Sequence, residues 1–376
     1  VPEDVLVVDL IHRSVKRIFE GENGQPPVAP TVKIINLSIG DPSRQFSQIM
    51  SPMAKLLDWL SVKYGVLFVV SAGNHGVAIA LEIPRANFNQ SQPSDIESAT
   101  VKALYQNARN LRLLSPAESI NGITVGSAHL DYATGIRMGD RIDPYGSTVL
   151  PSPISAFGSG YRRSIKPDIV YSGGKQLYRP QVSGDPVTIE PVVLRSSPGN
   201  KVACPGSLPG DVTATSHCCG TSNAASLITR AGGVCHNLLM QIFNEQAVGV
   251  EYAPYLAPLL KAMLVHGSGW GDSGELISQI LRTPDNTRQL KSWIARWLGY
   301  GLPQIERVLG CTEQRVTLLG FGGLKDNEAH VFKLPLPPSL GSRTDLRKLT
   351  VTLAWISPVA TNTQKYRTAG LWFETN

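Results

Sequence analysis

One segment of the sequence places a possible nucleophile in a setting that favours it. In "HCCGTSNAASL" (217–227), Ser222 stands where a loop is expected to become a helix. A hydroxyl at a helix N-terminus lies near unpaired N–H groups and the positive end of the helix dipole, and both stabilise developing negative charge. The side-chain amide of Asn74, in "VLFVVSAGN" (66–74), is able to donate a hydrogen bond to the same oxyanion. These residue types indicate acyl transfer by a serine nucleophile.

Small residues recur at three points where a strand is expected to end or a helix to begin. They are "NLSIGD" (36–41), "SAGNHG" (71–76) and "GTSNAA" (220–225). In open α/β sheets, ligands bind at the carboxyl ends of the strands. Glycine and serine let a second backbone approach closely, as a peptide substrate requires. Each signal is weak alone, because "GTS" is more often a helix cap and "AGN" a turn. Their order along the chain makes them specific.

The elements that must position these residues alternate along the chain. Strand 31–41, helix 50–65 and strand 66–74 form a βαβ unit, and both strands are nearly continuous in apolar residues. This pattern is typical of a parallel sheet covered by helices on both faces. Further expected elements are a helix near 10–19, strands at 120–131 and 167–174, and helices at 223–245, 254–268 and 273–283. The predicted fold class is therefore α/β.

The pattern changes near residue 310. Segments 315–323, 330–337 and 348–357 are predicted as strands with no helices between them. The proline-rich "LPLPPSLGS" (334–342) is predicted as a connection, because proline cannot serve a central ladder. We expect residues 310–376 to form a small β-rich module that is cut short at its end and is able to contact a protein partner.

Composition excludes several classes of function. With 42% hydrophobic and 17% charged residues, the chain is globular. The net charge of +6 is spread along the chain, whereas a nucleic-acid binder concentrates its charge on one face, so no nucleic-acid partner is expected. No apolar run approaches the roughly 20 residues of a membrane helix, so no membrane partner is expected.

The cysteines and acidic residues indicate neither a metal nor a cofactor. The five cysteines are odd in number and contain no CxxC pair, which favours reduced thiols in a cytosolic protein; a disulfide between two of them is the alternative. No aspartate-rich loop typical of calcium sites is visible. We expect a cytoplasmic protein, of bacterial origin, without a cofactor.

Taken together, these motifs resemble the subtilisin-like serine proteases, the subtilase family. "IINLSIG" (34–40), "VVSAGN" (69–74), "IKPDIVYSGG" (165–174) and "GTSNAA" (220–225) are similar to that family's segments in the same order, as are "LKAMLVHGS" and "GYG" further on. The resemblance implies a subtilisin-like peptidase domain over residues 1–309, with insertions near 77–115 (helical) and 172–209 (a loop). It also implies a β-sandwich-like module over 310–376.

The resemblance assigns roles to individual residues. Ser222 would be the nucleophile, and Asn74 would stabilise the oxyanion together with the backbone N–H of Ser222. The substrate-binding residues that it implies are Ser38, Ile39, Gly40, Ser71, Ala72, Gly73, Gly220 and Thr221. The implied activity is that of a serine endopeptidase acting on extended polypeptides.

The other two members of the catalytic triad do not stand where the resemblance requires them. The family order is Asp, then His, then Ser. The 33 residues before Ile34 contain neither an Asp-Thr/Ser-Gly nor a His-Gly-Thr motif. Asp9 and His12 are candidates, but no strand and helix separate them. We expect the Asp and His to be encoded upstream of Val1, which would leave this chain N-terminally incomplete and inactive alone.

Several other residues need an alternative interpretation. His75 is expected at the cleft rim, and His217 beneath the nucleophile loop or reaching toward the site. Cys219 is expected to be a small buried residue. The "GDSG" of 271–274 matches the chymotrypsin-like nucleophile motif, but it falls between helices, where Ser273 is explained as a helix cap.

Two other functions compete with the peptidase. A subtilase-like module without catalysis would bind peptides or proteins through the same cleft. A non-proteolytic acyl hydrolase would need a GxSxG elbow, which the sequence around Ser222 lacks.

Overall fold

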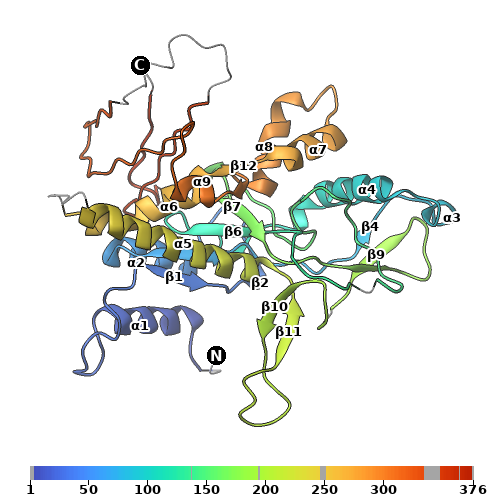
Figure 1. Cartoon of the computed structure of the whole chain (residues 1–376), viewed down its shortest axis with the longest axis horizontal. Coiled ribbons are helices and arrows are strands. Elements are labelled where there is room, and N and C mark those ends of the chain that lie inside the picture. The colour runs from blue at the N-terminus through green and yellow to red at the C-terminus, as the bar shows by residue number, and fades with distance from the viewer. Residues whose placement is uncertain are drawn as a thin grey trace.

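The computed structural model describes residues 4–136, 138–193, 195–245, 251–333, 348–363 and 365–374. Within these residues a parallel four-stranded sheet in the order β1–β3–β6–β7 lies at the centre (Figure 1). Its strands are β1 (Ile34–Leu37), β3 (Leu67–Ser71), β6 (Ile123–Ala128) and β7 (Ile169–Ser172). Neighbouring strands all run parallel. The predicted α/β fold is confirmed.

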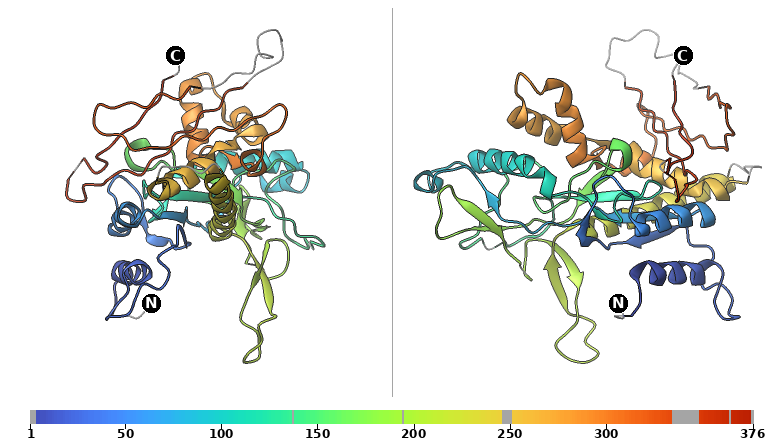
Figure 2. Two further views of the ribbon diagram at one scale, coloured as in Figure 1. Left: turned by 60° about the vertical axis from the view of Figure 1, so that its left-hand side comes forward. Right: turned by 180° about the vertical axis from the view of Figure 1, so that it is seen from behind.

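Helices cover both faces of this sheet (Figure 2). The longer ones are α1 (Val7–Phe19), α2 (Pro52–Tyr64), α4 (Pro93–Gln106), α5 (Thr221–Glu245), α6 (Leu256–His266), α7 (Gly271–Leu281) and α8 (Thr287–Leu298). The shorter ones are α3 (Arg85–Phe88), α9 (Glu306–Leu309) and the 3₁₀ turns Ala108–Asn110, Tyr161–Arg163 and Ala253–Tyr255. Among the described helices, none is long and apolar enough to cross a membrane.

The side chains of β3 alternate between two apolar cores. Leu67 and Val69 pack with α5 and α6, whereas Phe68 and Val70 pack with α1 and α2. All four are fully buried. A strand covered on both faces must be apolar at every position, which is why this segment reads as a continuous run in the sequence.

Helix α2 shows how local sequence sets the boundaries of an element. Ser51 Oγ accepts a hydrogen bond from the backbone N–H of Ala54 (3.1 Å), and Pro52 occupies the first helical position. Gly65 ends the helix with a φ of 60°, in the left-handed region. The predicted helix at 50–65 is confirmed.

Small antiparallel sheets surround the central one. They pair β2 (Asp41–Gln45) with β5 (Leu114–Ser115), β9 (Thr188–Pro191) with both β4 (Ile79–Ala80) and β8 (Tyr178–Pro180), β10 (Asn200–Ala203) with β11 (Thr215–Cys218), and β12 (Ser268–Gly269) with β13 (Leu302–Pro303). The segment 172–209 was expected to be a loop, but it contains β8, β9 and β10. These strands are short, and their alternation is too weak to distinguish them from a loop. The β10–β11 hairpin projects from the body of the molecule (Figure 1).

Beyond residue 310 the described chain is mainly extended. Its only bridges among the described residues are Thr312–Arg315 and Val359–Arg367, and no antiparallel ladder joins the predicted strands there. Residues 334–342, the expected connection, lie outside the described residues. The separate module over 310–376 stays a prediction.

Candidate active site

Ser222 is the second residue of α5, directly after a constrained turn. The backbone N–H of Gly220 donates to Gly173 O (2.8 Å), which ties the turn to the end of β7. Gly220 has a φ of 148°, and a Cβ placed on it would lie 2.9 Å from Asn74 Nδ2. Both the backbone conformation and the close amide require glycine here. The Ser222 side chain is half-buried, and its hydroxyl has no hydrogen-bond partner among the described residues.

Thr221 fixes the orientation of the Asn74 amide. Asn74 Oδ1 accepts hydrogen bonds from the Thr221 backbone N–H (2.9 Å) and from Thr221 Oγ1 (3.0 Å). Thr221 Oγ1 in turn accepts from the backbone N–H of Gly73 (3.2 Å). Since a backbone N–H can only donate, the amide oxygen must be the atom that faces Thr221. Asn74 Nδ2 is left without a hydrogen bond among the described residues, on an exposed side chain.

This corner is able to stabilise an oxyanion. The N–H groups of Thr221 and Asn223 already bond to Asn74 Oδ1 and Gly220 O. The Ser222 N–H has no partner among the described residues, and the positive end of the helix dipole lies beside it. Asn74 Nδ2 adds a side-chain donor close to Gly220. Donors that are held in place before the reaction stabilise developing charge without a cost of reorganisation.

The ends of β1 and β3 lie beside Ser222. Ser38 Oγ donates to Ser222 O (3.3 Å), and Ile39 next to it is 43% exposed. Ser71 ends β3, Ala72 follows it, and both are buried. Gly73 and Asn74 come next, and they reach Thr221 through hydrogen bonds. The structure therefore brings together the predicted residues Ser38, Gly73, Asn74, Gly220, Thr221 and Ser222.

Comparison with known proteins identifies the family of this chain. The profile of the Subtilase family matches residues 11–290, about three quarters of the chain. The chain belongs to the subtilase family. It is 28% identical over 344 residues to "Uncharacterized protein y4bN" of Sinorhizobium fredii, a match that covers 91% of this chain and 70% of that protein.

Solved structures of subtilase-like proteases are also similar. The prenylagaramide maturation protease PagA matches with 15% identity and a TM-score of 0.38, over 81% of this chain and 68% of that chain. The PatG macrocyclase in complex with peptide matches with 15% identity and a TM-score of 0.37, over 82% of this chain and 58% of that chain.

Asp9 and His12 do not stand at the active edge of this subtilase. Both belong to α1, where Asp9 is exposed and the His12 ring packs edge-on against Trp59 at 5.8 Å. Trp59 belongs to α2, so this contact joins two helices on one face of the sheet rather than the carboxyl ends of its strands.

The other candidate side chains have structural partners. His75 does not stand on the cleft rim: it is buried, its Nε2 bonds to Arg112 O (2.8 Å), and burial lowers its pKa. His217 lies in β11 opposite Lys201. Ser273 is not the helix cap that was expected, because it is the third residue of α7 and its hydroxyl donates to Val149 O.

A cluster at the end of β6 supports the nucleophile loop and was not foreseen from the sequence. His129 Nε2 bonds to Asp143 Oδ1 (2.9 Å), and Lys175 Nζ bonds to Asp143 Oδ2 (3.0 Å). Burial opposes the charge on Asp143, but the contacts with His129 and Lys175 outweigh it and lower the pKa of that carboxyl. Gln176, beside Lys175, accepts a hydrogen bond from the Cys219 thiol (3.1 Å). These residues are far apart in the chain, so no local motif reveals them.

The thiol beside the nucleophile is not itself reactive. All five cysteines are free, and burial raises the pKa of Cys219 to about 12. A thiol with so high a pKa stays protonated near neutral pH and is a poor nucleophile. Cys219 was expected to be buried, but its side chain is half-buried.

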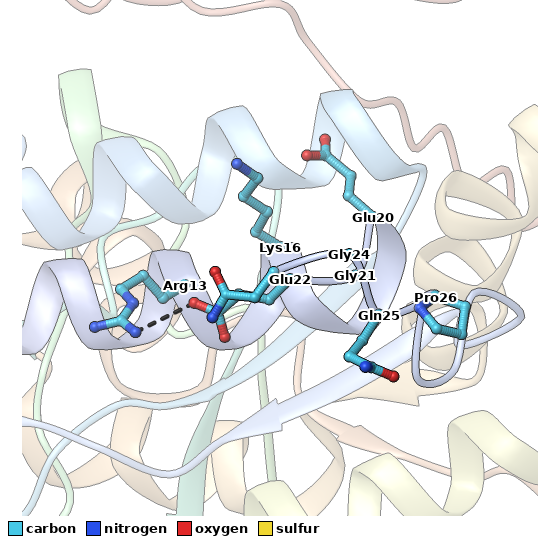
Figure 3. A pocket seen from close by; sticks show the side chains of 9 residues that line it. Arg13, Lys16, Glu20, Gly21, Glu22, Gly24, Gln25 and Pro26 are labelled. Carbon is cyan, nitrogen blue, oxygen red and sulfur yellow. Dashed lines mark hydrogen bonds and ion pairs between the residues drawn. The ribbon is translucent and has the colours of Figure 1, made fainter.

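A separate hollow lies beside α1 and the loop after it. It measures about 660 Å³, and Arg13, Lys16, Glu20 and Glu22 contribute charged side chains to it (Figure 3). None of the predicted site residues lines it. Across the described residues, no group of three His, Cys, Asp or Glu side chains is arranged to hold a metal ion.

Proposed function

We propose that this subtilase is a serine endopeptidase in which Ser222 attacks the peptide carbonyl and Asn74 stabilises the oxyanion. The observation that carries the proposal is the pair of hydrogen bonds from Thr221 to Asn74 Oδ1. They leave Asn74 Nδ2 free as a donor close to the start of α5, where Ser222 lies. This donor faces solvent on an exposed side chain, where a substrate oxygen is able to replace water.

The proposed reaction follows from the positions of these groups. Ser222 Oγ bonds to the carbonyl carbon, its proton passes to a general base, and the carbonyl electron pair moves to oxygen. Asn74 Nδ2 and the Ser222 N–H donate to that oxygen. Collapse of the intermediate breaks the C–N bond, the amine leaves with the proton, and water then releases the acyl group from Ser222.

Ser222 and Asn74 do not supply the general base that the reaction needs. The 33 residues before Ile34 contain neither of the two family motifs that carry the Asp and the His, and the Asp-Ser-Gly sequence of 272–274 follows Ser222 instead of preceding it. We propose that both are contributed by residues other than these 376. The chain alone should then keep only the residual rate of an oxyanion hole, about 10³–10⁴ over water.

An extended polypeptide is the substrate class that this edge suits. Ser38, Ile39 and Gly40 follow β1 directly, and a substrate strand is able to add its backbone to such a segment. Of the predicted segment Ser71, Ala72 and Gly73, the first two are buried, so Gly73 would form the opposite wall together with Asn74. Gly220 and Thr221 would close the end nearest the nucleophile.

The test is turnover of a chromogenic peptide by the complete gene product that contains this chain. Ser222→Ala should lower turnover by about 10⁵–10⁶, as loss of the serine does in subtilisin. Ser226→Ala is the matched control, because Ser226 lies one turn further along α5, where its hydroxyl donates to Ser222 O (2.9 Å) and accepts from Asn36 Nδ2 (3.3 Å). A Ser222→Ala protein that cleaves peptides as fast as the Ser226→Ala protein would contradict the proposal.

A second function is favoured by one observation. Three histidines have partners other than Ser222: His12 packs against Trp59, His75 bonds to Arg112 O and His129 bonds to Asp143. A subtilase-like module that binds peptides without cleaving them would need no base. If the complete gene product binds peptides with unchanged affinity after Ser222→Ala and hydrolyses none of them, this second function replaces the first.

A further inference from the structure

The excess positive charge of the chain comes from four segments that are far apart in the sequence. Residues 43–48, 107–114, 157–165 and 293–296 together carry six arginines and neither aspartate nor glutamate. Without these six, 29 of the 35 basic residues remain, which equals the 29 acidic residues. The sequence alone predicted that the net charge of +6 is spread along the chain, but all of it belongs to these segments. The arginines are Arg44, Arg109, Arg112, Arg162, Arg163 and Arg296.

The fold brings the four segments side by side. The Phe46 N–H donates to Leu113 O (2.7 Å), which joins the first segment to the second. The Leu113 N–H donates to Phe157 O (3.0 Å), which joins the second to the third. The Gly158 N–H donates to Arg296 O (2.8 Å), which joins the third to the fourth. The six arginines therefore lie on one hydrogen-bonded group of segments, and together they form the arginine surface.

The guanidinium groups of this surface lack a compensating charge. Arg112 is exposed although the residue on each side of it is buried, so its side chain points away from the core. Arg296 lies over the ring of Trp293, 4.4 Å from its centroid. No ion pair among the described residues involves four further exposed or neighbouring arginines, which are Arg44, Arg109, Arg112 and Arg163. Like charges held together without counter-charge repel one another, and a bound anionic segment would relieve this repulsion.

The arginine surface borders the candidate active site. Arg112 O bonds to His75 Nε2 (2.8 Å), and His75 directly follows Asn74. Ala156, one residue before the third segment, donates from its N–H to Gly73 O (3.0 Å). The segments that carry the arginines thus lie directly beside the residues that surround the oxyanion donor. A polypeptide bound there needs only a short extension to reach them.

We propose that the arginine surface binds an acidic segment of the polypeptide substrate, outside the residues that flank the scissile bond. The proposal rests on the peptidase function proposed above and names its substrate class. Guanidinium groups form paired, charge-assisted hydrogen bonds with carboxylates, and a field of one sign attracts an oppositely charged segment from a distance. The position beside the edge that suits a peptide backbone favours an acidic polypeptide over a nucleic acid.

The experiment measures the Kd of a fluorescein-labelled peptide of ten glutamates by fluorescence anisotropy. The protein is the complete gene product with Ser222→Ala, so that no ligand is cleaved. Arg44→Gln, Arg112→Gln and Arg163→Gln, combined, should weaken binding about tenfold at low ionic strength, since each exposed ion pair contributes part of the roughly 1.4 kcal/mol that a tenfold change represents. At about 1 M salt, where the Debye length is about 3 Å, most of this difference should disappear.

The matched control removes the same charge from exposed arginines of three other helices. It combines Arg17→Gln in α1, Arg230→Gln in α5 and Arg307→Gln in α9. Its Kd should equal that of the parent protein, and thermal unfolding of both triple variants checks that each is folded. If both triple variants weaken binding equally, the peptide responds to net charge alone and the proposal is wrong. A glutamate peptide that does not bind, or that binds equally well to the first triple variant, would also overturn it.

A nucleic acid is the competing ligand. A ten-nucleotide oligothymidylate has a charge similar to that of the glutamate peptide. If it binds more tightly than the peptide and loses this affinity in the first triple variant, the surface binds a nucleic acid and the proposal is overturned. Weaker binding of the oligonucleotide supports the proposal.

A kinetic readout separates this proposal from the peptidase function. In the protein with an intact Ser222, a glutamate tail on the chromogenic peptide should lower KM, and the first triple variant should lose this gain. If no peptide is cleaved but the glutamate peptide binds through these arginines, the peptidase function fails and the acidic ligand class stands. If peptides are cleaved and the tail leaves KM unchanged, the peptidase function stands and the role of the arginine surface fails.

Discussion

Two hydrogen-bonded clusters of this subtilase differ in whether their polar atoms all have hydrogen-bond partners. Around Asp58 in α2, all donors meet an acceptor: the carboxylate receives hydrogen bonds from Ser119 Oγ (2.6 Å), the N–H groups of Ile120 (3.2 Å) and Asn121 (2.8 Å), and the Tyr366 hydroxyl (2.6 Å). Around Ser222, the hydroxyl and Asn74 Nδ2 have no partner among the described residues. The first cluster is fully buried and the second lies at the surface.

The difference separates stability from chemistry. A buried carboxylate with four donors fixes the segment that carries Tyr366 to the main domain, and Asn121 adds two hydrogen bonds of 2.9 Å to the backbone of Ser357. Polar groups that are held in place but unpaired have the opposite use, since they are ready to bind a reacting atom. Substitutions in the first cluster should therefore change folding, and substitutions in the second should change rate.

Asp58→Ala should have the largest effect on folding. It leaves Tyr366, Ser119 and two backbone N–H groups buried without their acceptor, which should lower the free energy of unfolding by about 3–5 kcal/mol. Chemical denaturation followed by circular dichroism measures the loss. The rate per folded molecule should stay that of wild type; a lower rate with unchanged stability would break the comparison.

A pH series tests the same contact with the sign fixed in advance. Burial raises the pKa of Asp58 above its ordinary value of 3.8, although its hydrogen bonds partly offset this. A carboxyl with a higher pKa in the folded than in the unfolded state keeps its proton better when folded. Its contribution to stability is therefore present at low pH and is lost as pH rises from about 4 through the folded pKa. Asp58→Asn removes the titrating carboxyl. The free energy of unfolding of this variant should therefore not show the decrease that wild type shows as pH rises from about 4.

Asn74→Ala should act on the other cluster alone. Removing one side-chain donor from an oxyanion hole lowers kcat by about 10²–10³. Because Asn74 is exposed, its loss should alter the midpoint of unfolding far less than that of Asp58 does. Steady-state kinetics with the chromogenic peptide, at saturating concentration, gives kcat. A change confined to KM would mean that Asn74 binds substrate and does not stabilise the transition state.

The sequence was sufficient to predict the sheet and the residues that meet beside Ser222. β1, β3 and α5 are strongly patterned, and Gly220, Ser222 and Asn74 stand at their ends, so their meeting at one edge follows from the parallel order of strands. The orientation of the Asn74 amide could not be foreseen, because it depends on Thr221, which is distant in sequence.

Three other features depend on contacts that no local pattern encodes. The residues of the arginine surface come from four distant segments, and only the hydrogen bonds between these segments bring them together. The predicted strands after 310 failed to form a ladder among the described residues because an apolar, alternating segment is a strand only when a partner lies beside it. The contact of Tyr366 with Asp58 could not be predicted from the sequence either.

Thr221→Val should have the smallest effect, and it links the two halves of the comparison. Valine keeps the shape of threonine and the backbone N–H bond to Asn74 Oδ1, but it removes the 3.0 Å bond from Oγ1 and the acceptor of the Gly73 N–H. We expect kcat to fall about tenfold, since a loss of roughly 1.4 kcal/mol corresponds to one neutral hydrogen bond that positions the amide, while KM stays the same. Thr221→Ser keeps the hydroxyl and should restore kcat even though it removes a buried methyl group. If Thr221→Ser is as slow as Thr221→Val, the packing of the methyl group and not the orientation of Asn74 is what the reaction requires.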